Sequence, residues 1–131
     1  MLRRRVAVVV VALGLGLVAA GCGSSSSGGG GSYVEPSGPP VATETVQAGN
    51  LWFKPTAITV PQGIIQFTLT NTQSGVHSFV IRGVPGFMLE VSGQGDSQTK
   101  KVELKPGTYT YYCNIPGHEQ AGMKGTLTVT G

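Results

Sequence analysis

The stretch GTYTYYCNIPGHEQAGMKGTLTVTG, residues 107–131, contains two runs of alternating residues separated by a Gly-rich loop. In the first run Tyr109, Tyr111 and Cys113 share one face, and in the second run Leu127 and Val129 do. Alternation with period two, in segments rich in Thr, Tyr and Val, is typical of half-buried β-strands. The stretch therefore predicts two neighbouring strands and a connecting loop that begins at Cys113.

The same period recurs further upstream. Ile65, Phe67 and Leu69 share a face in GIIQFTLTN, and His77 and Phe79 share one in VHSFVIRG. Turn signals rich in Pro, Gly and Asn separate these runs, and none of them has a convincing helical period. We expect an all-β fold: an antiparallel Greek-key β-sandwich of about seven to eight strands.

The N-terminal part has a different composition. MLRRR is followed by fifteen apolar residues, VAVVVVALGLGLVAA, which resemble an export signal and are short for a membrane span of about 20 residues. AGC at residues 20–22 resembles the lipobox of bacterial lipoproteins, in which the chain is cut before an acylated cysteine. A chance cysteine after an ordinary signal peptide, or an uncleaved anchor, is the alternative.

A Gly/Ser-rich segment, residues 23–32, continues into the Pro-rich YVEPSGPP. Such a composition is typical of a flexible linker. We therefore expect a signal peptide over residues 1–21, a lipidated Cys22 with a flexible tether over residues 22–40, and a folded domain over residues 41–131.

Cleavage of the signal would change the charge of the chain. It would remove Arg3, Arg4 and Arg5 and leave six basic and six acidic residues. A near-neutral chain lacks the basic field that nucleic-acid binding requires. We expect the mature protein outside the cytoplasm, periplasmic or on the outer face, anchored to the cell membrane through the lipid on Cys22.

The chain has two cysteines, and two cysteines in an oxidising compartment would ordinarily form a disulfide. If Cys22 is lipidated, Cys113 is the only thiol left; a disulfide between the two is the alternative. A lone thiol outside the cytoplasm is open to oxidation. Coordination of the thiolate by a metal ion is one form of protection.

Two further soft or borderline ligands, His118 and Met123, follow Cys113 on the same loop. Thioether is a poor zinc ligand, whereas copper electron-transfer sites combine two histidines and a cysteine with a weak axial methionine. The chain has one other histidine, His77, on the inward phase of its run. His77, Cys113, His118 and Met123 are therefore the predicted metal site.

With these residues in this order, the domain resembles the cupredoxins, the family of plastocyanin, azurin, pseudoazurin and rusticyanin. The resemblance covers most of residues 41–131. It implies one copper ion, cycling between Cu(I) and Cu(II), held by His77, Cys113 and His118 with Met123 as the weak axial ligand. The spacing from Cys113 to His118 is longer than in plastocyanin and similar to that in rusticyanin.

The resemblance also bears on residues around the ligands. Ser78 stands where many members of the family have an asparagine that ties the two ligand loops together. Electrons are expected to enter and leave at His118. The docking patch around it is expected to contain the apolar residues Pro85, Phe87, Pro116 and Ala121. Phe87 and Met88 could equally be core residues, and we assign Met88 to the core.

We expect a monomeric, membrane-tethered type 1 copper protein that carries single electrons between redox proteins docking near His118. A copper-binding or copper-delivery protein with the same ligands is the alternative. We do not expect an enzyme, since the sequence has no carboxylate pair, Ser–His–Asp set or phosphate loop. The chain is also too short, and has too few histidines, for a copper nitrite reductase.

Overall fold

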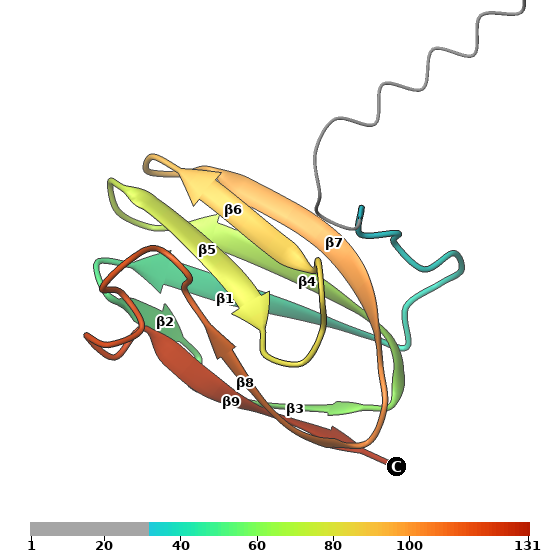
Figure 1. The fold of residues 1–131 in the computed structure, drawn as a ribbon. Helices are drawn as coiled ribbons and strands as arrows, with labels where there is room; N and C mark the ends of the chain where they lie inside the picture. The colour runs from blue at the N-terminus through green and yellow to red at the C-terminus, as the bar shows by residue number, and fades with distance from the viewer. Residues whose placement is uncertain (1–31) are drawn as a thin grey trace, which may run out of the picture.

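The computed structural model describes residues 32–131. The predictions for the signal peptide, for Cys22 and for the first part of the tether lie outside these residues. The described part of the chain forms nine strands in two sheets that face each other (Figure 1). It contains no helix of the length and apolarity needed to cross a membrane.

The two sheets have four and five strands. The first has the order β2 (Trp52–Lys54), β1 (Ala42–Gly49), β4 (Gly63–Asn71) and β7 (Ser97–Leu104). The second has the order β3 (Ala57–Pro61), β9 (Lys124–Thr130), β8 (Gly107–Tyr112), β5 (Val76–Ile81) and β6 (Met88–Ser92). The predicted all-β sandwich is confirmed. The count exceeds the predicted seven to eight because the three-residue β2 is a separate strand.

Two strand pairs are parallel. β1 runs parallel to β4, with Ala42 opposite Ile65, and β3 runs parallel to β9, with Ile58 opposite Leu127. The predicted antiparallel pairing does not hold for these two pairs. Each pair joins strands that are not consecutive in the chain, so no tight hairpin forces them to run in opposite directions.

The core lies between the sheets and follows the period-two pattern. Phe67 and Phe79 are 0% exposed, and Phe87 is 1% exposed. The ring of Phe79 packs 5.2 Å from that of Phe67 and 6.4 Å from that of Phe87, measured between centroids. Phe87 is therefore part of the aromatic core, and its prediction as a docking-patch residue is wrong.

Tyr111, on β8, lies two residues before Cys113, the first predicted ligand of the β8–β9 loop. A Cβ atom on Gly125 of β9 would lie 2.2 Å from the Tyr111 ring, so only glycine permits this close approach. The Tyr111 hydroxyl donates to the Pro55 carbonyl at 2.6 Å. Burial raises the pKa of Tyr111 to about 12. The ring and its hydroxyl thus tie β8 both to β9 and to the segment after β2.

The segment before β1 packs on β7, an edge strand of the first sheet. Tyr33 donates to the Lys101 carbonyl at 2.7 Å, and Glu35 accepts from the Lys101 N–H at 2.6 Å. The Tyr33 ring packs 5.4 Å from that of Phe87. Pairing of these edge groups removes a template for strand addition. The contacts begin N-terminal to residue 41, the predicted start of the domain.

Replacing Tyr111 with phenylalanine should lower the free energy of unfolding by about 1 kcal/mol, since the Pro55 carbonyl would lose its donor. Tyr109→Phe is the matched control: its hydroxyl donates to the exposed Lys105 carbonyl, where water can replace it. We expect its effect to stay within about 0.5 kcal/mol. Equal losses in denaturant unfolding of the two variants would contradict this role of Tyr111.

Candidate metal centre

Four connections meet at one end of the sandwich, at the left in Figure 1: β1–β2, β4–β5, β6–β7 and β8–β9. His77 is the second residue of β5, directly after the β4–β5 turn, and Cys113 directly follows β8. His118 and Met123 lie on the loop from β8 to β9. Antiparallel pairing of β5 with β8 therefore brings the first predicted ligand beside the other three.

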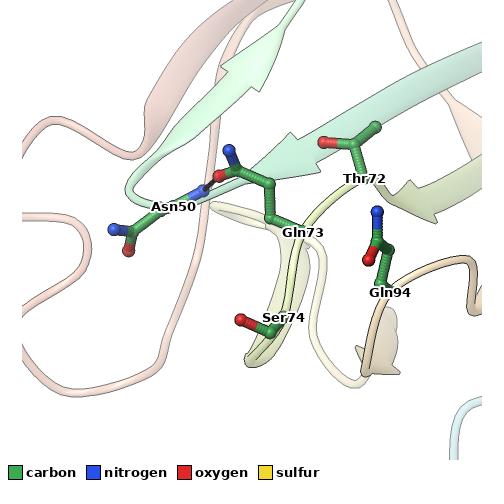
Figure 2. Close-up of a pocket in the computed structure, with 5 residues that line it drawn as sticks. All are labelled: Asn50, Thr72, Gln73, Ser74 and Gln94. Atoms are coloured by element: carbon green, nitrogen blue, oxygen red, sulfur yellow. Dashed lines mark hydrogen bonds between the residues drawn. The ribbon is translucent and has the colours of Figure 1, made fainter.

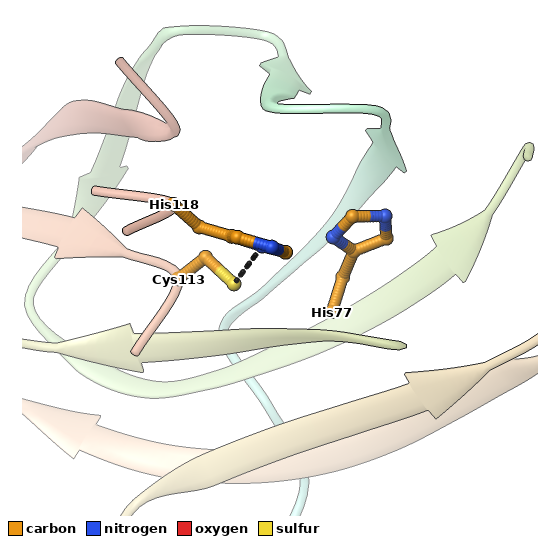
Figure 3. A group of neighbouring side chains, drawn as sticks. All are labelled: His77, Cys113 and His118. Carbon is orange, nitrogen blue, oxygen red and sulfur yellow. Dashed lines mark hydrogen bonds between the residues drawn. The ribbon is translucent and has the colours of Figure 1, made fainter. Parts of the chain in front are cut away.

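The potential ligand atoms of His77, Cys113 and His118 all lie within 4.8 Å of one another. The Cys113 Sγ is 3.4 Å from the His118 Nδ1, and the two imidazole rings are 5.3 Å apart between centroids. Figure 3 shows the His77 ring turned toward the other two side chains. The three predicted strong ligands thus converge on one small volume.

His77 is only 2% exposed, yet both of its ring nitrogens lack a hydrogen-bond partner within the described structure. Leaving a buried polar atom unsatisfied costs about 1–3 kcal/mol, so such groups usually have a partner. Burial lowers the pKa of His77, and the nearby His118 lowers that pKa further. Both effects favour the neutral imidazole, which is the form that binds a metal ion.

Cys113 is fully buried and forms no disulfide within residues 32–131. Met123 is also 0% exposed, and its backbone closes the ligand loop. The Cys113 N–H donates to the Met123 carbonyl at 3.1 Å, and the Met123 N–H donates to the His118 carbonyl at 3.0 Å. These bonds hold the buried methionine next to the cysteine and the second histidine in the loop.

Ser78 links the two ligand-bearing segments, as the resemblance implied for this position. The Asn114 N–H donates to the Ser78 Oγ at 2.9 Å, and the Ser78 hydroxyl donates to the Asn114 Oδ1 at 2.6 Å. Because that hydroxyl proton is already used at short range, the Ser78 N–H, 3.4 Å away, is the main donor to the Cys113 Sγ. The resemblance implied that many family members link the two loops through an asparagine at the position of Ser78. In this chain the asparagine of the link is Asn114, and its partner is Ser78.

A second support lies in the turn before His77, and sequence reasoning missed it. Asn71 is 1% exposed; its Nδ2 donates to the Gly75 carbonyl at 2.8 Å, and its Oδ1 accepts from the Gln73 N–H at 3.4 Å. The sequence identified NTQSG only as a turn. An asparagine that opens such a turn commonly bonds the backbone two residues on, which is the signal that could have identified Asn71.

A polar recess lies beside the same turn. Figure 2 shows its lining residues, Asn50, Thr72, Gln73, Ser74 and Gln94. The Asn50 N–H donates to the Gln73 Oε1 at 2.6 Å, which braces the turn against the β1–β2 connection. None of the five side chains titrates near neutral pH, so the recess offers no general acid or base.

The apolar residues expected around His118 do not all lie there. Pro116 and Ala121 are exposed on the ligand loop. Pro85 follows β5, which runs away from His77, so Pro85 lies at the opposite end of the sandwich. Its assignment to the patch is therefore wrong. Met88, assigned to the core, is only half-buried, and its Sδ accepts from the Asn114 Nδ2 at 3.6 Å.

The donor set decides which metal fits. A thiolate and two imidazoles, with a buried thioether in the same loop, match the copper electron-transfer pattern of two histidines, a cysteine and a weak axial methionine. Structural zinc sites use four cysteines and histidines, and thioether is not among their ligands. The unpartnered nitrogens of His77 and the geometry of the three strong donors therefore fit copper.

Comparison with known proteins agrees with this geometry. Residues 41–130 match the family described as copper binding proteins, plastocyanin/azurin family. The chain is 33% identical over 96 residues to plastocyanin from Dryopteris crassirhizoma, covering 63% of this chain and 92% of that protein. It is 76% identical over 39 residues to auracyanin-B from Chloroflexus aurantiacus, 30% of this chain and only 16% of that relative.

Two solved structures have a similar fold. The structure of auracyanin B has a TM-score of 0.61 and 27% identity, covering 79% of this chain and 97% of that one. The dithionite-reduced auracyanin from the photosynthetic bacterium Roseiflexus castenholzii has a TM-score of 0.62 and 26% identity, covering 72% of this chain and 100% of that one.

The metal-free protein should lose stability as the pH falls below about 6.5. The unfolded chain then protonates His77 at its ordinary pKa, whereas the folded chain resists protonation because that pKa is lowered. The contribution of neutral His77 to the free energy of unfolding is therefore fully present above about pH 6.5. It is lost as the pH falls toward the lowered pKa that His77 has in the folded protein. Denaturant unfolding at several pH values should show a flatter profile for His77→Leu; an unchanged slope would place the titration elsewhere.

Asn71→Ala should lower the unfolding free energy by about 2 kcal/mol, because the Gly75 carbonyl loses its donor and the turn before His77 loosens. Gln73→Ala is the control on the same turn, since Gln73 is exposed. We expect it to cost less than half as much. If chemical denaturation gave the reverse order, Asn71 would not be the residue that holds this turn.

Proposed function

This chain belongs to the copper-binding plastocyanin/azurin family, and we propose that it carries single electrons between protein partners outside the cytoplasmic membrane. One observation supports this proposal above the others. Two histidines and a cysteine converge within 4.8 Å, and the buried His77 has no hydrogen-bond partner in the described structure. Such a site is built for a bound metal ion rather than for a reaction with a substrate.

In this proposal His77, Cys113 and His118 would hold the copper ion, and Met123 would be the weak fourth ligand. Copper, when bound, would supply a one-electron couple between Cu(I) and Cu(II). The chain supplies fixed positions for the donors, because each one lies in or beside a strand or in a loop closed by backbone hydrogen bonds. A site that moves little between two oxidation states has a small reorganisation cost, which favours rapid electron transfer.

The sulfur environment sets how strongly Cys113 donates. The Ser78 N–H points at the Cys113 Sγ and stabilises negative charge on the sulfur. Hydrogen bonds of this kind tune the potential of a bound metal. By withdrawing electron density from the thiolate, this bond favours the reduced state. Burial of Cys113 and of Met123 excludes water and acts in the same direction.

His118 is the ligand nearest to solvent. It is half-buried, whereas His77, Cys113 and Met123 are buried, and exposed Pro116 lies on its loop. A redox partner that docks on this loop would come closer to His118 than to any other ligand. We therefore place the entry and exit of electrons at His118, with a protein partner contacting the exposed part of the loop.

Attachment to the cell membrane is part of the same proposal. The lipobox-like AGC at residues 20–22 and the Gly/Ser-rich segment after it support a lipid anchor on Cys22 followed by a tether. An anchored domain on a linker can meet membrane-bound partners without being lost to the medium. Metabolic labelling with a radioactive fatty acid tests this part of the proposal. We expect the label to be incorporated into the protein, and we expect Cys22→Ala to abolish its incorporation.

The decisive experiment is optical and electrochemical measurement on the copper-loaded protein. We expect an intense thiolate-to-copper band in the visible spectrum and a reversible one-electron potential. Cys113→Ser should abolish the band, whereas Met123→Leu should keep it and raise the potential, because a weak donor to Cu(II) is lost.

Three results would count against parts of this proposal. A protein that stays colourless after loading with Cu(II) would refute the site. A lower potential in Met123→Leu would refute the axial assignment. Ready transfer of copper to a metal-free acceptor protein, without a reversible potential, would favour a delivery protein over an electron carrier.

A further inference from the structure

The His118 half of the ligand loop has few attachments to the sandwich. Its backbone hydrogen bonds are internal: His118 N–H to the Ile115 carbonyl at 3.0 Å, Ala121 N–H to Gly117 at 3.2 Å, and Gly122 N–H to Glu119 at 2.9 Å. These bonds shape the loop, but they do not join it to either sheet. At its start Ile115 packs against the core, and beyond Ile115 the contacts of the loop with the body of the protein come from side-chain hydrogen bonds.

Side chains connect the loop to the body of the protein at two places. Near Cys113, Asn114 is bonded to Ser78. Next to His118, the Glu119 carboxylate accepts from the Arg82 guanidinium and forms an ion pair with it. In the described structure, this is the one side-chain hydrogen bond that joins residues 115–122 to a residue outside the loop.

The guanidinium of Arg82 makes a second contact. Its Cζ lies 4.5 Å from the centroid of the Tyr112 ring. Tyr112 directly precedes Cys113, and Glu119 directly follows His118. One side chain therefore contacts the neighbours of two metal ligands. The backbone of Arg82 is itself held in place, because the backbone N–H of Arg82 donates to the Thr110 carbonyl at 2.8 Å.

We propose that Arg82 is a positioning residue that holds the His118 half of the loop against the outer face of β8, with or without a bound metal ion. The inference deepens the proposed function, because it assigns the preorganisation of His118 to a residue remote in sequence. It rests on that function only for the copper measurement below.

Arginine suits this task better than lysine. Its planar guanidinium can stack on the Tyr112 ring and pair with a carboxylate at the same time, whereas an ammonium is a compact point charge. Exposed ion pairs add little to global stability. The case of residues 115–122 is different: in the described structure their side chains make no other hydrogen bond outside the ligand loop, so a small energy can decide between docked and undocked positions.

Amide hydrogen exchange of the metal-free full chain tests the proposal without copper. In Arg82→Ala, we expect the amides of Ala121 and Gly122 to exchange about fivefold faster, the size that one exposed ion pair with one cation–π contact provides. Strand amides should be unchanged. Lys105→Ala is the matched control, because it removes the same charge from an exposed turn. Unchanged loop exchange in Arg82→Ala, or an equal change in Lys105→Ala, would overturn the proposal.

Loss of copper to a competing chelator is the second readout. We expect about fivefold faster loss in Arg82→Ala, partial recovery in Arg82→Lys, and no added effect when Glu119→Gln is combined with Arg82→Ala. Additive effects of the two substitutions would overturn the linkage through Glu119. If the unaltered protein binds no copper, the proposed function fails, and the exchange measurement alone still decides the role of Arg82.

Discussion

The structure depends on a buried imidazole that the protein itself does not satisfy. His77 lies on β5 with 2% of its surface exposed, and neither ring nitrogen has a hydrogen-bond partner in the described structure. The cost of this arrangement is tolerable only if an external group completes it. The Cys113 thiol and the His118 ring lie within reach of the same point. A metal ion is the group that can satisfy all three at once.

Residues around the predicted ligands, at the same end of the sandwich, keep these donors in place. Asn71 shapes the turn that leads into His77, and Ser78 joins that strand to Asn114 beside the cysteine. Below them, Tyr111 packs over Gly125 and fixes β8 against β9. Each of these residues forms hydrogen bonds or packs tightly against a neighbouring strand, so the donors are positioned before a metal ion binds. Fixed donors of this kind are the physical basis for the small reorganisation that the proposed electron transfer would require.

Sequence reasoning failed where distant segments had to be placed relative to one another. Alternation identifies which residues face inward but not which strands are neighbours, so the parallel β1–β4 and β3–β9 pairs were missed. Phe87 and Pro85 lie at the Pro85-Gly86 turn, and their apolar character made them candidates for an exposed patch, with the core as the equal alternative for Phe87. Only the direction of β5 places that turn at the far end, and only the packed sandwich buries Phe87, whose ring contacts those of Phe67, Phe79 and Tyr33.

The sequence by itself determined the chemistry: the donor types are fixed by residue identity, and the spacing of Cys113, His118 and Met123 places three of them on one loop. It also determined the all-β class, because period-two burial is local to each strand. Tertiary structure alone decided that His77 meets that loop, and that Arg82 reaches Glu119. Both are contacts across 36 or more positions, and no local preference encodes such a contact. They follow from the pairing of β5 with β8, which only the packed sandwich specifies.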